Sequence, residues 1–136
     1  MAVTSDEILR DVLKSTETVA VVGCSTSPGK AAHDIPKYML DHGYDVIPVN
    51  PYAEEIFGRS AYDELANVPD GVDLVDVFRP SEETGPIVDE AIERDDVETV
   101  WLQLGITNDA AGERAKAAGK RFVQDRCLKV EHQRLL

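Results

Sequence analysis

The sequence predicts an α/β protein with one parallel sheet of five strands between two layers of helices. Two observations predict this class. Five short apolar segments, each the length of a strand, are spaced along the 136 residues. Stretches with helical character separate them, and such alternation favours parallel strands joined by right-handed crossovers. The chain also has the usual length of one domain, so residues 1–136 are expected to form a single domain.

The first predicted elements are a helix, a strand and a second helix. Residues 5–15 begin with Ser and Asp and carry apolar side chains on one face, which is typical of an amphipathic helix. Residues 18–22 form a continuous apolar run, as in a strand covered on both faces. A loop of small residues, 23–30, leads to a helix over about 34–41. We expect Pro36 in its first turn, where the missing N–H is harmless.

The second strand is predicted over residues 44–49, with Pro48 limiting the hydrogen bonding near its end. Residues 52–70 are expected to be mostly loop, with one helical turn near 62–65. Residues 73–78 form the third predicted strand.

The C-terminal half continues the alternation. Residues 81–94 are expected to form a helix with Ser81 as its cap, although Pro86 moves its regular start to about Gly85. The remaining segments are predicted as a strand, a helix, a strand and a short terminal helix, over 98–104, 108–118, 120–124 and 127–134.

These elements predict a Rossmann-like three-layer sandwich with the strand order 3-2-1-4-5. Ligands of such sheets bind outside the carboxyl ends of the strands, where the strand order reverses direction. The loops that begin at Gly23, Asn50, Arg79 and Gly105 are therefore expected to converge on one site.

The loop of residues 23–30, GCSTSPGK, is the strongest functional signal. Glycines let the backbone approach a ligand closely, the hydroxyl groups donate hydrogen bonds, and the next helix points its N-terminal amides at the same space. Lys30 adds a positive charge. This combination indicates a site for a phosphate or a diphosphate.

The loop lacks the usual dinucleotide and P-loop patterns. A G-x-G-x-x-G pattern from Gly23 would need glycine at Ser25 and Pro28. The second strand ends in Val49-Asn50-Pro51, without the acidic residue that usually binds the ribose of NAD. Ala31 follows Lys30 where a P-loop needs Ser or Thr.

Several motifs in order resemble one known family. GCSTSPGK, HGYDVIPVNP, VDVFRPSEE, VWLQLGI and DRCLKVEH look like the small stand-alone CoA-binding domain proteins. Their fold is similar to that of the N-terminal CoA-binding domain of the succinyl-CoA synthetase alpha subunit. The resemblance extends from about residue 5 to residue 134.

The resemblance implies that coenzyme A, or an acyl-CoA, is the ligand. The loop after the first strand would cradle its phosphates and ribose, through Gly23, Ser25, Thr26, Ser27, Gly29 and Lys30. Val49, Asn50 and Pro51 would flank the adenosine. Phe78 and Arg79 would line the site after the third strand, with Arg79 a candidate phosphate partner. Gln103, Gly105 and Ile106 would lie near the pantetheine arm.

No catalytic set is apparent, so we expect binding without catalysis. The synthetase uses a phosphorylated histidine from a following domain, and this chain ends before such a domain begins. Cys24 is expected to be buried and inert, and no sequence pattern indicates a role for His132. Neither Cys24 nor Cys127 belongs to a C-x-x-C pair, so neither a zinc site nor a disulfide is expected.

The net charge of −12 argues against nucleic-acid and anionic membrane partners. We find no signal peptide and no run long enough to span a membrane, so we expect a cytoplasmic protein. The excess of acidic residues suits a salt-rich, halophilic cytoplasm, where molar salt screens self-repulsion.

Two alternative functions stay open. The general fold would also suit an NAD(P)-binding domain or small oxidoreductase. An enzyme acting on acyl-CoA could use Cys24 or groups borrowed from an oligomer partner. The sequence identifies neither a protein partner nor an oligomeric state.

Overall fold

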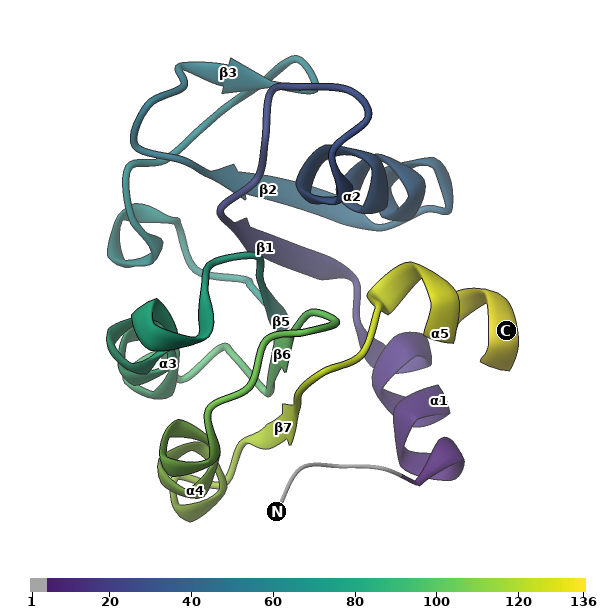
Figure 1. The fold of residues 1–136 in the computed structure, drawn as a ribbon, viewed down its shortest axis with the longest axis vertical. Helices are drawn as coiled ribbons and strands as arrows, with labels where there is room; N and C mark the ends of the chain where they lie inside the picture. Colours follow the sequence, from purple (N-terminus) through teal and green to yellow (C-terminus); the bar gives the residue numbers. More distant parts are fainter. Residues whose placement is uncertain (1–4) are drawn as a thin grey trace.

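The computed structural model describes residues 5–136 and contains the expected five-stranded parallel sheet (Figure 1). Its strands lie in the order β2-β1-β5-β6-β7. Their bounds are Thr18–Val22 for β1, Asp45–Val49 for β2, Leu74–Val77 for β5, Thr99–Leu102 for β6 and Arg121–Val123 for β7. The Rossmann-like α/β class is confirmed.

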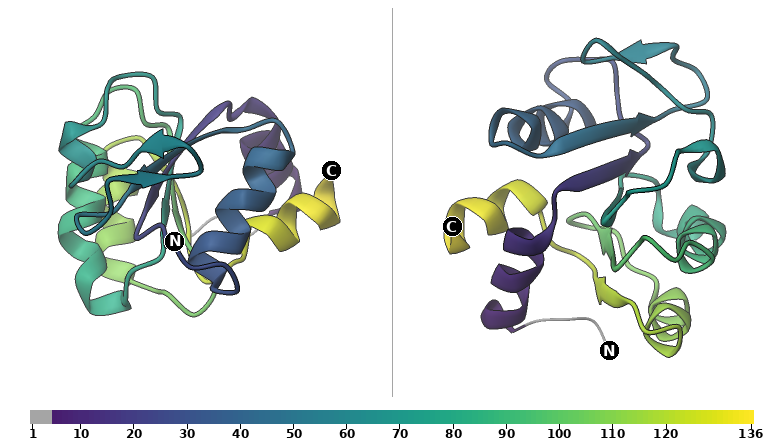
Figure 2. Two further views of the ribbon diagram at one scale, coloured as in Figure 1. Left: turned by 90° about the horizontal axis from the view of Figure 1, so that it is seen from above. Right: turned by 180° about the vertical axis from the view of Figure 1, so that it is seen from behind.

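Helices cover both faces of the sheet (Figures 1 and 2). One face carries α1, α2 and α5, over Asp6–Ser15, Ala31–Asp41 and Leu128–Leu135. The other carries α3 and α4, over Thr84–Ile92 and Asp109–Ala117. Alternate strand residues feed the two sides: Val75 and Val77 pack toward α3 and α4, whereas Leu74 packs toward α1 and α2. This pattern explains why the strands read as continuous apolar runs.

The strand order differs from the expected 3-2-1-4-5. The third of the five strands, β5, pairs with β1 and does not lie beyond β2. Residues 50–73 cause this placement, because they cross the face covered by α3 and α4, where Leu65 and Val68 pack with Val88. A right-handed crossover on that face runs from β2 past β1, opposite to the α2 crossover. The reversal therefore lies between β1 and β5.

The segment after β2 contains a hairpin that the sequence did not predict. Strands β3 (Glu55–Ile56) and β4 (Arg59–Ser60) pair antiparallel. Phe57 and Gly58 form the turn with φ of 57° and 73°, and a bulky residue at positive φ is an uncommon turn signal. The expected helical turn is a 3₁₀ turn slightly later, η1, over Leu65–Asn67.

Helix α2 begins earlier than expected, so Pro36 lies inside it and not in its first turn. A proline at this position leaves the carbonyl of Ala32 without its usual i+4 donor. The amide of Ser25 supplies the missing hydrogen bond, with an N–O distance of 2.9 Å. The loop after β1 is thereby fastened to the helix that follows it.

The predicted helix over 81–94 divides into a 3₁₀ turn, η2 (Ser81–Glu83), and α3. Ser81 does not cap α3. Its hydroxyl oxygen accepts a hydrogen bond from the amide of Thr107, 3.0 Å away. Within residues 5–136, no helix is long and apolar enough to cross a membrane.

Candidate functional site

A cavity of about 520 Å³ opens at the carboxyl ends of β1, β2 and β5. It lies at the observed reversal of the sheet, because the chain leaves β1 toward α2 and leaves β5 toward α3 on opposite faces. This is the place where open α/β sheets bind ligands. The side chains and backbone around it come from the loops after these three strands, from η1, from η2 and from α3.

Gly23 forms the floor of the cavity, directly after β1. Its φ is +87°, a conformation that side chains disfavour. A Cβ atom at this position would lie 2.9 Å from Cδ of Arg79. The amide of Gly23 donates to the carbonyl of Val49, 3.0 Å away, and so holds the β1 and β2 ends together. Glycine at position 23 therefore lets the Arg79 side chain pass.

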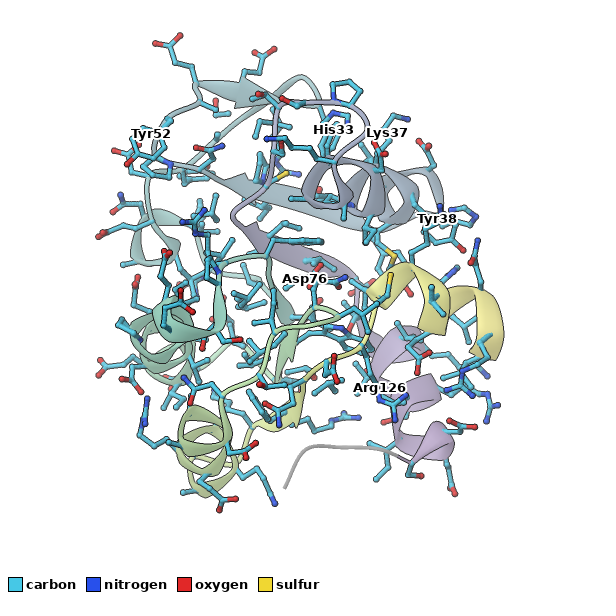
Figure 3. All side chains as sticks on the ribbon, viewed as in Figure 1. His33, Lys37, Tyr38, Tyr52, Asp76 and Arg126 are labelled. Atoms are coloured by element: carbon cyan, nitrogen blue, oxygen red, sulfur yellow. The ribbon has the colours of Figure 1, made fainter. Side chains whose placement is uncertain are left out.

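Asn50 ties the β1 loop to the β2 loop. Its Nδ2 donates to the carbonyl of Cys24 at 2.9 Å, and its Oδ1 accepts from the amide of Tyr52 at 2.8 Å. Both side-chain groups therefore have partners within the protein. Tyr52 lines the cavity and is 96% exposed, standing at the edge of the molecule (Figure 3).

The positive charges of the cavity wall come from Lys30 and Arg79. Arg79 is engaged by Glu83: Nε and Nη2 donate to Oε1 at 3.2 and 3.0 Å, and Nη2 donates to Oε2 at 3.1 Å. Both side chains are about half exposed. The guanidinium that was expected to bind a phosphate thus faces an internal carboxylate here.

The wall also has an acidic part, which contains none of the residues predicted from the sequence. Four carboxylates line the cavity, from Asp63, Glu64, Glu83 and Glu90. They come from the residues just before η1, from η2 and from α3, which lie apart in the sequence. Because these residues are far apart in the sequence, their grouping could be predicted only with knowledge of the strand order.

The predicted site residues divide into two groups. Those that line the cavity are Gly23, Ser25, Lys30, Val49, Asn50, Pro51, Phe78 and Arg79. Three of the four loops that were expected to converge line this cavity, and the loop that begins at Gly105 does not. The cavity lining does not include Thr26, Ser27, Gly29, Gln103, Gly105 or Ile106.

The residues after β6 have structural contacts instead. Gln103 is buried, and its Oε1 accepts from the amide of Leu128 at 3.1 Å. The amide of Gly105 donates to Oδ1 of Asp125 at 2.7 Å. Ile106 packs against the core under α3 and α4. Their place near a pantetheine arm stays a prediction.

The first loop also has internal contacts. Thr26 and Ser27 are exposed, and the amide of Ser27 donates to Oγ of Ser25 at 3.0 Å. The amide of Gly29 donates to Oδ1 of Asp34 at 3.1 Å. This bond, followed by the contact with His33, lowers the pKa of Asp34. The amide of Gly29, which is predicted to bind a phosphate, therefore already donates its hydrogen bond to the carboxylate of Asp34.

Cys24 is fully buried, although it borders the cavity. Burial, and secondarily the nearby Asp76, raise the pKa of its thiol to about 12. Nucleophilic cysteines have lowered pKa values, because the thiolate is the reactive form. The environment of Cys24 is therefore that of an inert thiol. No cluster of metal-ligating side chains occurs among residues 5–136.

Comparison with known proteins gives a consistent result. The family model described as "CoA binding domain" matches residues 17–133. The uncharacterized protein YneT of Bacillus subtilis (strain 168) is 36% identical over 124 residues, covering 91% of each chain. An ADP-forming acetate–CoA ligase of Methanocaldococcus jannaschii is 34% identical over 65 residues, which cover 48% of this chain and 9% of the ligase.

Solved structures extend the likeness over nearly the whole chain. A hypothetical protein from Pyrococcus horikoshii OT3 is 39% identical with a TM-score of 0.92, covering 97% of this chain and 92% of that one. The cell-free protein ID.343 from Thermus thermophilus is 39% identical with a TM-score of 0.91, covering 98% of this chain and 100% of that one.

Proposed function

Because the chain belongs to the CoA-binding domain family, we propose that it binds coenzyme A or an acyl-CoA in the cavity at the ends of β1, β2 and β5. We further propose that it has no catalytic activity of its own. Binding is then its function, as a carrier, a sensor or an accessory subunit.

The observation that carries this proposal is the cavity wall at the strand reversal. Gly23 leaves room for the Arg79 side chain to cross the end of β1, and Lys30 and Arg79 lie on the same wall. A guanidinium binds phosphate oxygens through two parallel hydrogen bonds, and an ammonium binds them as a point charge. The cavity volume of about 520 Å³ lies within the usual range for cofactor sites.

No observation favours the alternative functions over this one. The buried thiol of Cys24 argues against an acyl-CoA-processing nucleophile. An NAD(P) site would draw on the same fold, but both polar groups of Asn50 at the end of β2 already have partners. The test therefore also measures the binding of NAD⁺ and NADP⁺ and the turnover of an acyl-CoA.

The test is calorimetric titration of the purified protein with CoA, acetyl-CoA, NAD⁺ and NADP⁺ in buffers of low and high KCl. We expect CoA or acetyl-CoA to bind, and NAD⁺ and NADP⁺ to bind at least tenfold more weakly. Lys30→Ala and Arg79→Ala should each weaken CoA binding. Lys116→Ala, which removes an exposed charge on α4, is the matched control and should not.

Two results would overturn the proposal. Absence of CoA and acetyl-CoA binding at millimolar ligand would remove the binding function. Tighter binding of NAD⁺ or NADP⁺ would move the protein to the other ligand class. Consumption of acetyl-CoA during long incubation would overturn the non-catalytic part alone.

We also propose that the protein works in a salt-rich cytoplasm. At a net charge of −12, the acidic side chains repel one another and also repel a polyanionic ligand. Because salt screens this repulsion, the melting temperature should rise between 0.1 and 2 M KCl. A melting temperature that falls over this range would contradict a halophilic adaptation. Sedimentation in the same buffers would test for a homo-oligomer.

A further inference from the structure

We propose that Glu83 is a competing internal anion that gates Arg79, and that a ligand phosphate must displace it to bind. This inference rests on the proposed CoA-binding function and names the residue that regulates the site. The ligand group concerned is a phosphate or diphosphate.

Glu83 binds the guanidinium of Arg79 in the way that an anionic ligand would bind it. Three hydrogen bonds of 3.0 to 3.2 Å join the guanidinium of Arg79 to both carboxylate oxygens of Glu83. A phosphate would use the same guanidinium edge, because planar bidentate recognition is common to carboxylates and phosphates. Arg79 cannot present this edge to both partners at once.

Glu83 is not needed elsewhere for the fold. It stands at the N-cap of α3, but its side chain makes no capping hydrogen bond. A negative charge is favourable at this end of a helix even without a cap bond. The carboxylate therefore keeps a favourable position after Arg79 leaves it. An exposed pair of this kind is weak enough to exchange.

The path of Arg79 is restricted on its other side. Its Cγ and Cδ lie against Gly23, where an added Cβ atom would be only 2.9 Å from Cδ. The side chain therefore crosses the cavity floor before it meets Glu83. Only the end of the side chain has to turn for the guanidinium to leave Glu83, because the Cγ and Cδ atoms lie against Gly23.

The cavity lining has more carboxylates than cations, so a polyanionic ligand needs Arg79 to turn from Glu83 to the phosphate. Glu83 is one of four carboxylates that line the cavity, against the two cations Lys30 and Arg79. While Arg79 stays paired with Glu83, a polyanionic ligand meets Lys30 as the remaining cation of the lining. Moving Arg79 to the phosphate restores a second positive partner.

The test is a double-mutant cycle of Glu83→Gln and Arg79→Ala, with CoA titrated by calorimetry in 0.5 M KCl. We expect Glu83→Gln alone to tighten CoA binding by roughly two- to fivefold, the range that an exposed ion pair allows. The same change should have no effect in the Arg79→Ala background. Glu82→Gln removes an equal charge from the same turn outside the cavity lining, and it should leave the affinity unchanged.

Any other outcome would contradict the proposal that Glu83 competes with a ligand phosphate for Arg79. Weaker binding by Glu83→Gln would mean that Glu83 holds Arg79 in its binding position. An equal gain in the Arg79→Ala background would mean that Glu83 acts only as a repelling charge. Melting temperatures of all variants control for folding. If wild-type protein binds no CoA, the proposed function fails; if it binds and the cycle shows no coupling, only the gate fails.

Discussion

The side chain of Arg79 crosses the Cα of Gly23 so closely that a Cβ atom there would lie 2.9 Å from Cδ of the arginine. Gly23 follows β1 and Arg79 follows β5, which are neighbours in the sheet. The two loops therefore share the space in which a ligand is proposed to bind.

This relationship predicts that Gly23→Ala weakens both folding and CoA binding. Alanine at a φ of +87° is expected to cost about 1–2 kcal/mol of stability. It also pushes Arg79 from its path, so CoA affinity should fall. Gly43→Ala is the control, because Gly43 has a φ of +94° with open space around it and lies at the end of α2. It should lower stability alone, and equal CoA affinities of the two variants would contradict the prediction.

The carboxyl group of Asp76 is fully buried in β5, in the interior of the molecule (Figure 3). Within residues 5–136, neither oxygen has a hydrogen-bond partner. Burial raises the pKa of Asp76 well above its usual value. The neutral form is thus favoured in the folded state, whereas the unfolded chain ionises above about pH 4.

Asp76→Asn is therefore predicted to stabilise the protein, and increasingly so as pH rises. At low pH the carboxyl group of Asp76 is neutral in both states and costs no ionisation energy. As pH rises from the pKa in the unfolded chain toward the higher pKa in the folded protein, the folded state loses stability relative to the unfolded state. We expect a gain at pH 7 and little change at pH 4, because only the ionised carboxylate is penalised by burial. Denaturant unfolding at both pH values measures it. Asp70→Asn, at an exposed position, should be neutral, and a destabilised Asp76→Asn at pH 7 would refute the account.

Arg94 holds the loop that precedes β5. Its guanidinium donates to the carbonyls of Leu65, Val68 and Pro69 at 2.8 to 3.0 Å and pairs with Asp96 at 2.8 Å. Lysine cannot reproduce this planar fork. Arg94→Lys should cost about 2–3 kcal/mol in denaturant unfolding. Arg114→Lys, in an exposed pair with Asp89, should cost less than about 1 kcal/mol; equal losses would show that the loop does not depend on Arg94.

His132 joins α5 to α2, because its Nδ1 lies 2.8 Å from the hydroxyl of Tyr38. The rings of His42 and Tyr44 meet it edge-on, and Lys129 lies over the Tyr38 ring. Burial, and secondarily the charge of His42, lower the pKa of His132. The unfolded chain therefore binds the proton more readily than the folded protein does.

The sign of this shift predicts a loss of stability in acid. Between pH 7.5 and 5.5, stability should fall as pH passes below the unfolded value of about 6.5. His132→Gln should flatten this part of the pH profile in urea unfolding. Tyr38→Phe should cost about 1 kcal/mol at pH 7.5, because it removes the hydrogen bond. A His132→Gln profile as steep as that of the wild type would locate the acid sensitivity elsewhere.

Much of the fold could be predicted from local patterns. The apolar runs at Thr18–Val22 and Leu74–Val77 became central strands, and Asn108 became the cap of α4. The start of α2 was missed because a distant amide, that of Ser25, satisfies the carbonyl that Pro36 leaves free. The hairpin at Phe57 was missed because its turn places a bulky residue at positive φ.

The sequence by itself determined the alternation of strands and helices, the glycine loop and the resemblance to CoA-binding domains, because these depend on residues close together in the chain. Only the tertiary structure decided that β5 lies beside β1, which brings Arg79 over Gly23 and gathers Glu83, Asp63 and Glu90 around one cavity. The handedness of the crossover over residues 50–73 sets that neighbour. Because crossovers are right-handed, the neighbour depends on which face the segment packs against, and no local pattern specifies that face.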